Sequence, residues 1–204
     1  MPLIAWSINA AKSSKLIDQV IVSTDCNSIL ATAKKFGAIA LKRPSDLADD
    51  FTSAYEVARY VYLNQIEQKP NYVVLLQPTS PLREKDLIDN GIKAIQEDNS
   101  IDRVIEVNSL RLFSGKVMKN IWIPDYPEDK RSQDIHETFF PSGRLYIYRA
   151  KTAMEKHEAE GNTKVILGNY ERNVNIDYEC DFEKLDFVYR NHEFDYIHLL
   201  DSRV

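Results

Sequence analysis

Hydrophobic positions along the chain follow two spacings, and each spacing predicts one kind of element. Apolar residues three and four positions apart predict amphipathic helices, whereas short apolar runs rich in β-branched residues predict buried strands. The predicted helices cover 2–16, 29–36, 54–66, 87–95, 152–160 and 181–190. The predicted strands cover 19–23, 38–41, 72–76, 104–107, 145–148 and 173–176.

Strands and helices alternate through the first half of the chain, and this predicts an α/β fold. We expect a mostly parallel sheet with helices on both faces. Since the sequence holds no internal repeat and no low-complexity tract, we expect one domain over residues 1–204. The interval of about 109–142 breaks the alternation and contains Pro124, Pro127 and Pro141. We interpret it as a hairpin followed by a long functional loop.

Composition excludes several classes of protein. The formal net charge of −5 disfavours a nucleic-acid or anionic-membrane surface as the main role. The two cysteines, Cys26 and Cys180, lie far apart and indicate a reducing compartment without a disulfide framework. No run approaches the roughly 18 apolar residues that span a bilayer, and the first residues lack the pattern of a signal peptide. We expect a cytoplasmic protein.

Candidate chemistry begins in residues 75–83, with the sequence LLQPTSPLR, directly after a predicted strand. Prolines stiffen the backbone here, at the strand end where ligands bind in open α/β sheets. Gln77 and Ser80 could donate hydrogen bonds to a polyhydroxy ligand, and Arg83 could bind an anion. The alternative is a purely structural turn.

Polar residues also follow the first two predicted strands. Ser23 ends one of them, before Thr24 and Asp25, either of which could instead cap the next helix. Arg43 directly follows the other strand. Its guanidinium could simply be solvated, or it could contact a phosphate or a base of a nucleotide. Arg131 belongs to a mixed charge run that matters only if its loop folds over the sheet edge.

Asn175 and Asp177 alternate in a predicted strand, so their side chains would point the same way. That arrangement suits a magnesium ion that is shared with substrate phosphates, since magnesium takes one or two carboxylates and keeps several waters. The alternative, which does not exclude the first, is that Asp177 caps the last helix.

Together these residues resemble the acylneuraminate cytidylyltransferases, also called CMP-sialic acid synthetases, over nearly the whole chain. The most specific landmark is the 75–83 stretch. The ordered landmarks are Pro2-Leu3-Ile4-Ala5, Val22-Ser23-Thr24-Asp25, Arg43-Pro44 with Leu47-Ala48 and Asp50, residues 75–83, Arg131 with Gln133, Pro141 with Gly143, and Ile176-Asp177.

The resemblance implies a Rossmann-like fold of the nucleotide-diphospho-sugar transferase type. It implies that a nine-carbon α-keto sugar acid attacks the α-phosphate of CTP and releases pyrophosphate, with Mg²⁺ (or Mn²⁺) as cofactor. It also implies a homodimer formed through the 109–142 region. The roles implied residue by residue are catalysis by Asp177 and Arg131, nucleotide binding by Ser23, Arg43 and Ser80, substrate binding by Gln77, Gln133 and Gly143, and metal binding by Asp177 and Asn175.

The sequence departs from the family pattern at three places. Family members begin with a strand and a glycine-rich loop that binds the triphosphate, whereas the first glycine here is Gly37. We therefore expect the first strand to be missing and the chain to be a truncated or mis-started enzyme. Asn175 replaces a family aspartate, and Ser142 replaces a family asparagine. The alternative is a non-catalytic homologue that binds a sugar acid or nucleotide, or dimerises with an active partner.

Overall fold

The computed structural model describes residues 1–159 and 161–191. The helices are α1 (Leu3–Ser13), α2 (Asn27–Lys35), α3 (Ala54–Asn64), α4 (Leu87–Gln96) and α5 (Asp181–Asn191), with short turns η1 (Ser45–Leu47), η2 (Ser132–Asp134), η3 (Lys151–Glu155) and η4 (Tyr170–Arg172). The strands are β1 (Ile21–Thr24), β2 (Ile39–Lys42), β3 (Tyr72–Leu75), β4 (Arg103–Leu110), β5 (Gly115–Met118), β6 (Ile121–Pro124), β7 (Thr138–Arg149) and β8 (Thr163–Leu167).

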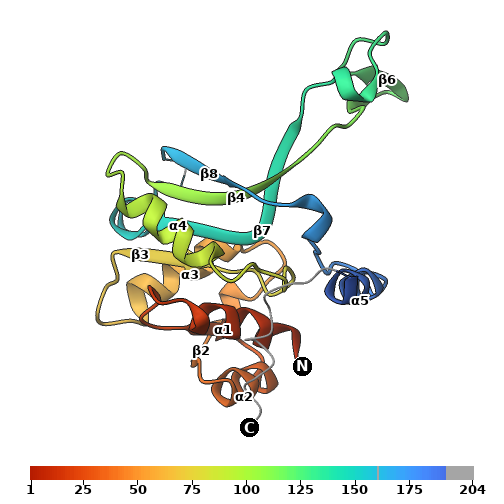
Figure 1. The fold of residues 1–204 in the computed structure, drawn as a ribbon. Coiled ribbons are helices and arrows are strands. Elements are labelled where there is room, and N and C mark those ends of the chain that lie inside the picture. The colour runs from red at the N-terminus through yellow and green to blue at the C-terminus, as the bar shows by residue number, and fades with distance from the viewer. Residues whose placement is uncertain (160, 192–204) are drawn as a thin grey trace.

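The central sheet has four strands in the order β3-β7-β4-β8 (Figure 1). Strand β7 runs antiparallel to both of its neighbours, and β8 runs parallel to β4. Strands β3, β4 and β8 therefore share one direction. Strands β1 and β2 form a separate parallel pair. The α/β class is confirmed, with β7 as the reversed strand of the central sheet.

Helices cover both faces of the central sheet, and the alternation of side chains along β7 shows why. Leu145 and Ile147 pack with the apolar side of α4 and with Val104 of β4. Tyr146 and Tyr148 belong to a second cluster, on the other face, with residues of α3 and η3. Because successive side chains of a strand point to opposite faces, one strand serves two cores. Helix α1 also packs on the β1–β2 pair.

Near the carboxyl end, one predicted strand does not form and one observed strand was not predicted. Residues 173–176 form no strand; Val174 and Ile176 instead pack on Leu82, and the Ile176 N–H donates to the Thr79 carbonyl at 2.8 Å. The strand in this part of the chain is β8, which the sequence pattern missed. Its outward side chains, Val165 and Leu167, are apolar yet exposed, so the polar-apolar alternation of a half-buried strand is absent.

The predicted helix at 152–160 is also shorter than expected. Among its described residues, 152–159, only the single π-helical turn η3 forms, and His157 follows it with a positive φ of 62°; Glu160 lies outside the described residues. A left-handed residue interrupts a right-handed helix, so the helix ends there.

Residues 111–137, which we call the arm, project from the body between β4 and β7 (Figure 1). Strands β5 and β6 form an antiparallel hairpin there, as predicted. Its two turn residues, Lys119 and Asn120, have φ values of 50° and 64°. Two successive positive φ values are typical of the type I′ turns that join two-residue hairpins. The expected loop is shorter than predicted, because β7 already begins at Thr138. Dimerisation through this region stays a prediction.

In the part of the chain that the structure describes, the helices are all too short or too polar to traverse a lipid bilayer.

The role of β7 in the core predicts a position-dependent loss of stability. Ile147→Ala should lower the free energy of unfolding by about 2–5 kcal/mol, since it empties a wholly buried site. Val165→Ala removes less from a half-exposed site in the same sheet and should stay within about 0.5 kcal/mol of wild type. Denaturant titration measures both. Equal losses of unfolding free energy in the two variants would show that β7 does not contribute more to the core than the edge strand β8 does.

Candidate active site

Residues 76–86 connect β3 to α4, and we call them the proline loop. Contacts within the loop and with neighbouring residues hold it in place. The Ser80 N–H donates to the Gln77 carbonyl at 3.1 Å and closes a turn. Leu82 is wholly buried against Val174, Ile176 and other apolar side chains. The loop is therefore fixed in place at the carboxyl end of β3.

Strand β7 carries a large bulge opposite this loop. Tyr146 pairs with Ile105 and Pro141 pairs with Val107, so β7 advances five residues where β4 advances two. The extra residues lie within residues 142–145, which we call the bulge. Its Gly143 has a φ of 80°, a conformation that side chains with a Cβ rarely adopt. Bulges of this kind re-aim side chains and are common beside functional sites.

The proline loop and the bulge meet at Gly143. A Cβ on Gly143 would collide with Ser80 Oγ and would lie 2.7 Å from Gln77 Oε1 and 3.2 Å from Asn175 Oδ1. The Ser80 hydroxyl also donates a hydrogen bond to Asn175 Oδ1. Gln77, Ser80, Gly143 and Asn175, all predicted site residues, therefore lie together.

Asp177 lies two residues beyond Asn175 and is exposed. The backbone N–H groups of Asp177 and Tyr178 donate to Asp181 Oδ2 at 2.9 and 2.8 Å. These bonds hold the pKa of Asp181 below its ordinary value, and they make Asp181 the acceptor at the start of α5. The described residues contain no group of three or more His, Cys, Asp or Glu placed to hold a metal.

Ser23 and Arg43 also lie together, at the carboxyl ends of β1 and β2. Arg43 Nη2 donates to the Ser23 carbonyl at 2.6 Å, and the Arg43 N–H donates to the Thr24 carbonyl at 3.0 Å. Within the described residues, Ser23 Oγ and Arg43 Nε are buried without a hydrogen-bond partner. The hydroxyl of Thr24 accepts from the Cys26 N–H at 3.2 Å, and the N-cap of α2 is Cys26 rather than Thr24 or Asp25.

Arg131 and Gln133 do not join these residues. Both belong to the arm, at and beside η2. Arg131 is 72% exposed in its side chain and pairs with Asp134, with Nε 2.8 Å from Oδ2. Within one copy of the chain the arm holds these two residues away from the sheet (Figure 1).

The interpretation of Arg83 as an anion contact is wrong. Its side chain is only 2% exposed, and protein acceptors take up its donors. Nε donates to the Arg144 carbonyl at 2.8 Å, and Nη2 to the Gln77 carbonyl at 2.8 Å. Nη1 donates to the Ser7 hydroxyl at 3.0 Å. Arg83 therefore ties the proline loop to the bulge and to α1.

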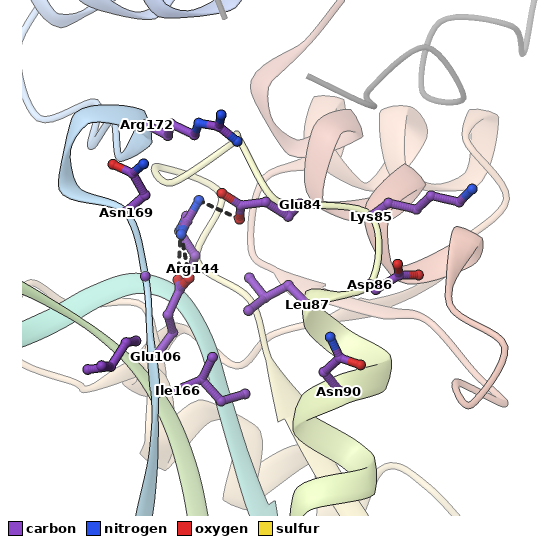
Figure 2. A pocket seen from close by; sticks show the side chains of 12 residues that line it. Glu84, Lys85, Asp86, Leu87, Asn90, Glu106, Arg144, Ile166, Asn169 and Arg172 are labelled. Atoms are coloured by element: carbon purple, nitrogen blue, oxygen red, sulfur yellow. Dashed lines mark hydrogen bonds and ion pairs between the residues drawn. The ribbon is translucent and has the colours of Figure 1, made fainter. Parts of the chain in front are cut away.

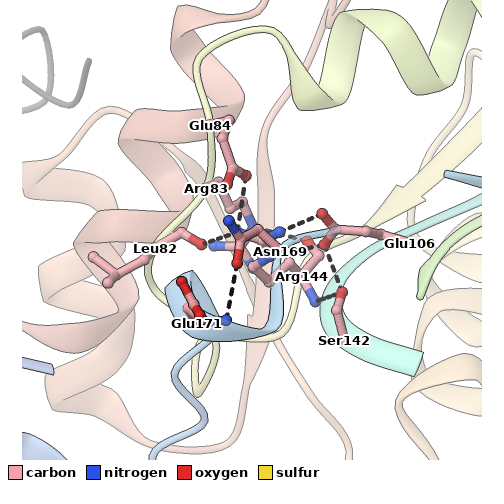
Figure 3. Close-up of polar contacts among 8 residues, drawn as sticks. All are labelled: Leu82, Arg83, Glu84, Glu106, Ser142, Arg144, Asn169 and Glu171. Atoms are coloured by element: carbon pink, nitrogen blue, oxygen red, sulfur yellow. Dashed lines mark hydrogen bonds and ion pairs between the residues drawn. The ribbon is translucent and has the colours of Figure 1, made fainter. Parts of the chain in front are cut away.

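Sequence reasoning also missed a buried ion pair between Arg144 and Glu106 (Figure 3). Arg144 is 0% exposed and Glu106 is 1% exposed. Arg144 Nε donates to Glu106 Oε2 at 2.7 Å, Nη2 donates to Oε1, and Nη1 lies 2.8 Å from Glu84 Oε2. The Ser142 hydroxyl donates to Glu106 Oε2 at 2.6 Å. The detectable signal was a charge inside the apolar 104–107 run, because a charge buried there needs a partner.

The protonation of Arg144 follows from these neighbours. Burial disfavours the charged guanidinium, but Glu106 and then Glu84 outweigh that effect, so the pKa of Arg144 lies above its ordinary value. Beside the pair lies a pocket of about 460 Å³ between the start of α4 and the end of β8 (Figure 2). Its lining includes Glu84, Leu87, Asn90, Glu106, Arg144 and Arg172.

Comparison with known proteins places the chain in a family. The family model described as "Cytidylyltransferase" matches residues 1–198. The N-acylneuraminate cytidylyltransferase of Escherichia coli O18:K1:H7 is 29% identical over 197 residues, covering 89% of this chain and 44% of the relative. This chain thus spans less than half of that protein. The pseudaminic acid cytidylyltransferase of Campylobacter jejuni serotype O:2 is 26% identical over 204 residues, covering 94% of this chain and 87% of the relative.

A solved structure shares the fold. The structure of CMP:2-keto-3-deoxy-manno-octonic acid synthetase complexed with CTP has a TM-score of 0.65 at 14% identity. The match covers 93% of this chain and 88% of that one. At such low identity the likeness concerns the fold alone.

The close approach at Gly143 predicts that even a methyl group is harmful there. Gly143→Ala should combine the cost of about 1–2 kcal/mol for a left-handed alanine with a collision against Ser80 and Gln77. Gly37→Ala is the matched control, since Gly37 has a φ of 77° but meets only the flexible end of Lys12. Thermal unfolding should show a clearly larger loss for Gly143→Ala. Losses of the same size would mean that loop and bulge are not in close contact.

Proposed function

The chain belongs to the cytidylyltransferase family, and from this premise we propose that it transfers a cytidylyl group from CTP to a nine-carbon α-keto sugar acid, releasing pyrophosphate. The observation that carries the proposal is the cluster of Gln77, Ser80, Gly143 and Asn175 at the carboxyl end of β3. The E. coli and C. jejuni relatives are named as cytidylyltransferases for N-acylneuraminate and pseudaminic acid, and these names support the same substrate class.

The sugar acid would bind where the proline loop meets the bulge. A nine-carbon sugar offers several hydroxyls, and Gln77 provides an amide that both donates and accepts hydrogen bonds. Gly143 has no side chain, so a ligand can approach its backbone closely. In the reaction, the anomeric hydroxyl oxygen would attack the α-phosphorus of CTP, the P–O bond to the pyrophosphate group would break, and the hydroxyl proton would pass to solvent. The protein's part is to orient the two reactants.

The nucleotide would lie near Ser23 and Arg43. The two residues lie together at the carboxyl ends of β1 and β2, where Arg43 Nη2 donates to the Ser23 carbonyl at 2.6 Å. Arg43 could donate to a phosphate or a base oxygen. Ser80 would contribute from the proline loop, between nucleotide and sugar.

Asp177 and Asn175 fit a Mg²⁺ (or Mn²⁺) site, since magnesium needs few protein oxygens when phosphates and waters complete its shell. The Asp177 carboxylate is exposed, while the Asp177 backbone N–H donates to Asp181 Oδ2 at 2.9 Å. Asn175 Oδ1 accepts from Ser80, which would orient the amide beside the nucleotide. A bound ion would supply positive charge against the triphosphate.

The arm supports a homodimer. Its hairpin exposes apolar side chains, among them Val117, Met118, Ile121 and Trp122. An exposed apolar patch of this kind marks an interaction surface. We propose that a second copy of the chain covers it, and that the arm carries Arg131 and Gln133 to the partner's site, where Arg131 would meet phosphate charge.

Pyrophosphate release tests the proposed function. The chain should release pyrophosphate from CTP with magnesium only when an accepted sugar acid is present, tested with neuraminate, legionaminate and pseudaminate types. CTP alone and the eight-carbon ketodeoxyoctonate are the controls. Release without any sugar acid, or none with the whole panel from folded protein, would contradict the proposal.

Removing the carboxylate charge at residue 177 should weaken nucleotide binding in a metal-dependent way. Asp177→Asn should lower the affinity for CTP about tenfold or more in magnesium, and should change nothing in EDTA. Asp186→Asn, an exposed carboxylate on α5 that pairs with Arg190, is the control. Calorimetric titration measures both. Equal affinities for wild type and Asp177→Asn in magnesium would remove Asp177 from the metal site.

A charge on the hairpin should separate the proposed dimer. Sedimentation should give wild type twice the 23.6 kDa mass of the chain, and Ile121→Asp should give the monomer. A buried carboxylate in an apolar interface is strongly unfavourable. Phe51→Asp introduces the same charge at an exposed aromatic outside the arm and should remain dimeric. A wild-type monomer, or a dimeric Ile121→Asp, would overturn this assignment.

A further inference from the structure

We propose that the buried Glu106–Arg144 pair is a positioning device: it holds the bulge and the proline loop in the geometry that binds the sugar acid. The inference rests on the proposed function, and it concerns two residues that the family resemblance does not mark. Neither would touch the substrate. They would act through Gly143 and through the backbone of the proline loop.

The first observation is that the two segments are tied reciprocally by arginines. Arg83, from the proline loop, donates to the carbonyl of Arg144 in the bulge. Arg144, from the bulge, donates to the carbonyl of Leu82 at 3.3 Å and contacts Glu84 in the proline loop. Each guanidinium thus binds the other segment's backbone. Because guanidinium donors are planar and fixed in direction, the pair constrains orientation as well as distance.

The second observation is that Glu106 anchors the residues on both sides of Gly143. Ser142 donates its hydroxyl to Glu106, and Arg144 makes a two-point contact with the same carboxylate. The Ser142 hydroxyl also accepts from the Arg144 N–H at 3.1 Å. Gly143 is therefore held at both ends, with its open side against Ser80 and Gln77.

The third observation is that Glu106 is packed on its far side too. A Cβ on Gly168, which follows β8, would lie 2.8 Å from Glu106 Oε1. The end of β8 therefore closes over the carboxylate and restricts its movement. Figure 2 shows the pair at the wall of the pocket, beside β8 and the loop that leads to α4. The Glu106 carboxylate is thus contacted by Ser142, by Arg144 and by the end of β8, and these contacts fix the position of the bulge.

Stability alone is a poor reason for this arrangement. Burying two charges costs desolvation free energy, and the attraction between the charges does no more than offset that cost. Well-packed apolar residues of similar size often give a protein of equal stability. The pair also lies outside the apolar core clusters, at the end of the sheet where the proline loop and the bulge meet. What an apolar pair cannot reproduce is the set of directed hydrogen bonds to Ser142, Glu84 and the Leu82 carbonyl.

The test separates stability from positioning by replacing both charges together. The double variant Glu106→Leu/Arg144→Met leaves no unpaired buried charge and should stay folded. Its KM for the sugar acid should rise about tenfold or more, and clearly more than its KM for CTP, to which the proline loop contributes Ser80 alone. Arg144→Lys keeps the charge but loses the two-point contact, so it should show a smaller shift in the same direction.

Arg149→Met is the matched control. Arg149 lies on the same strand and donates to the carbonyls of Ile95 and Ile101, but at the end of β7 away from the bulge. Its loss should leave the ratio of the two KM values unchanged, whatever it does to stability. A similar KM shift in this control would show that any arginine loss on β7 disturbs the site, and would overturn the assignment.

Hydrogen exchange supplies a readout that needs no activity. In the double variant and in Arg144→Lys, amides of residues 77–84 and 142–146 should exchange faster, with the rest of the sheet unchanged. If wild type turns over no sugar acid, the proposed function fails, and exchange still decides the positioning role. Unchanged exchange in both segments, or a folded double variant with the wild-type KM for the sugar acid, would overturn it.

Discussion

Two guanidinium groups are buried beside the sheet, and the geometry of the candidate site follows from the need to pair them. An arginine cannot shed its charge in a protein, so burial demands acceptors for every donor. Arg83 finds them mainly in backbone carbonyls, and Arg144 in Glu106 and Glu84. Because each arginine binds the segment that carries the other, the proline loop and the bulge are fixed as one unit.

The sheet supplies the frame for this unit. Strand β7 packs against α4 on one face and against α3 and η3 on the other, so it is held firmly along its carboxyl half. Its bulge adjoins that packing, since Leu145 belongs to both, and lies beside the carboxyl end of β3. The rigid part of β7 thus positions the irregular part, and the irregular part presents Gly143 to Ser80 and Gln77. Reversal of β7 relative to β3 is what brings the two segments to the same place.

The sequence predicted those features that depend on local patterns. The apolar stripe of α3, the hairpin within residues 109–142 and the stiff stretch that contains Gln77 and Ser80 all have local signals. It did not predict features that depend on pairing across the sheet. Strand β8 lacks alternation because it is an edge strand with exposed Val165 and Leu167. The partner of Glu106 lies 38 residues away. Arg83 was predicted to contact an anion because its acceptors are mainly backbone carbonyls, and a pattern of side chains does not show which carbonyls lie near an arginine.

The proposed function requires the sugar acid to bind where the proline loop meets the bulge. The most direct measurement is a crystal structure of the chain with CTP, magnesium and an unreactive analogue of the sugar acid. The hydroxyls or the carboxylate of the sugar should lie within hydrogen-bond distance of Gln77 and of the backbone at Gly143. Density for the sugar in the pocket between α4 and β8 instead, with the Gln77 and Gly143 contacts empty, would contradict it.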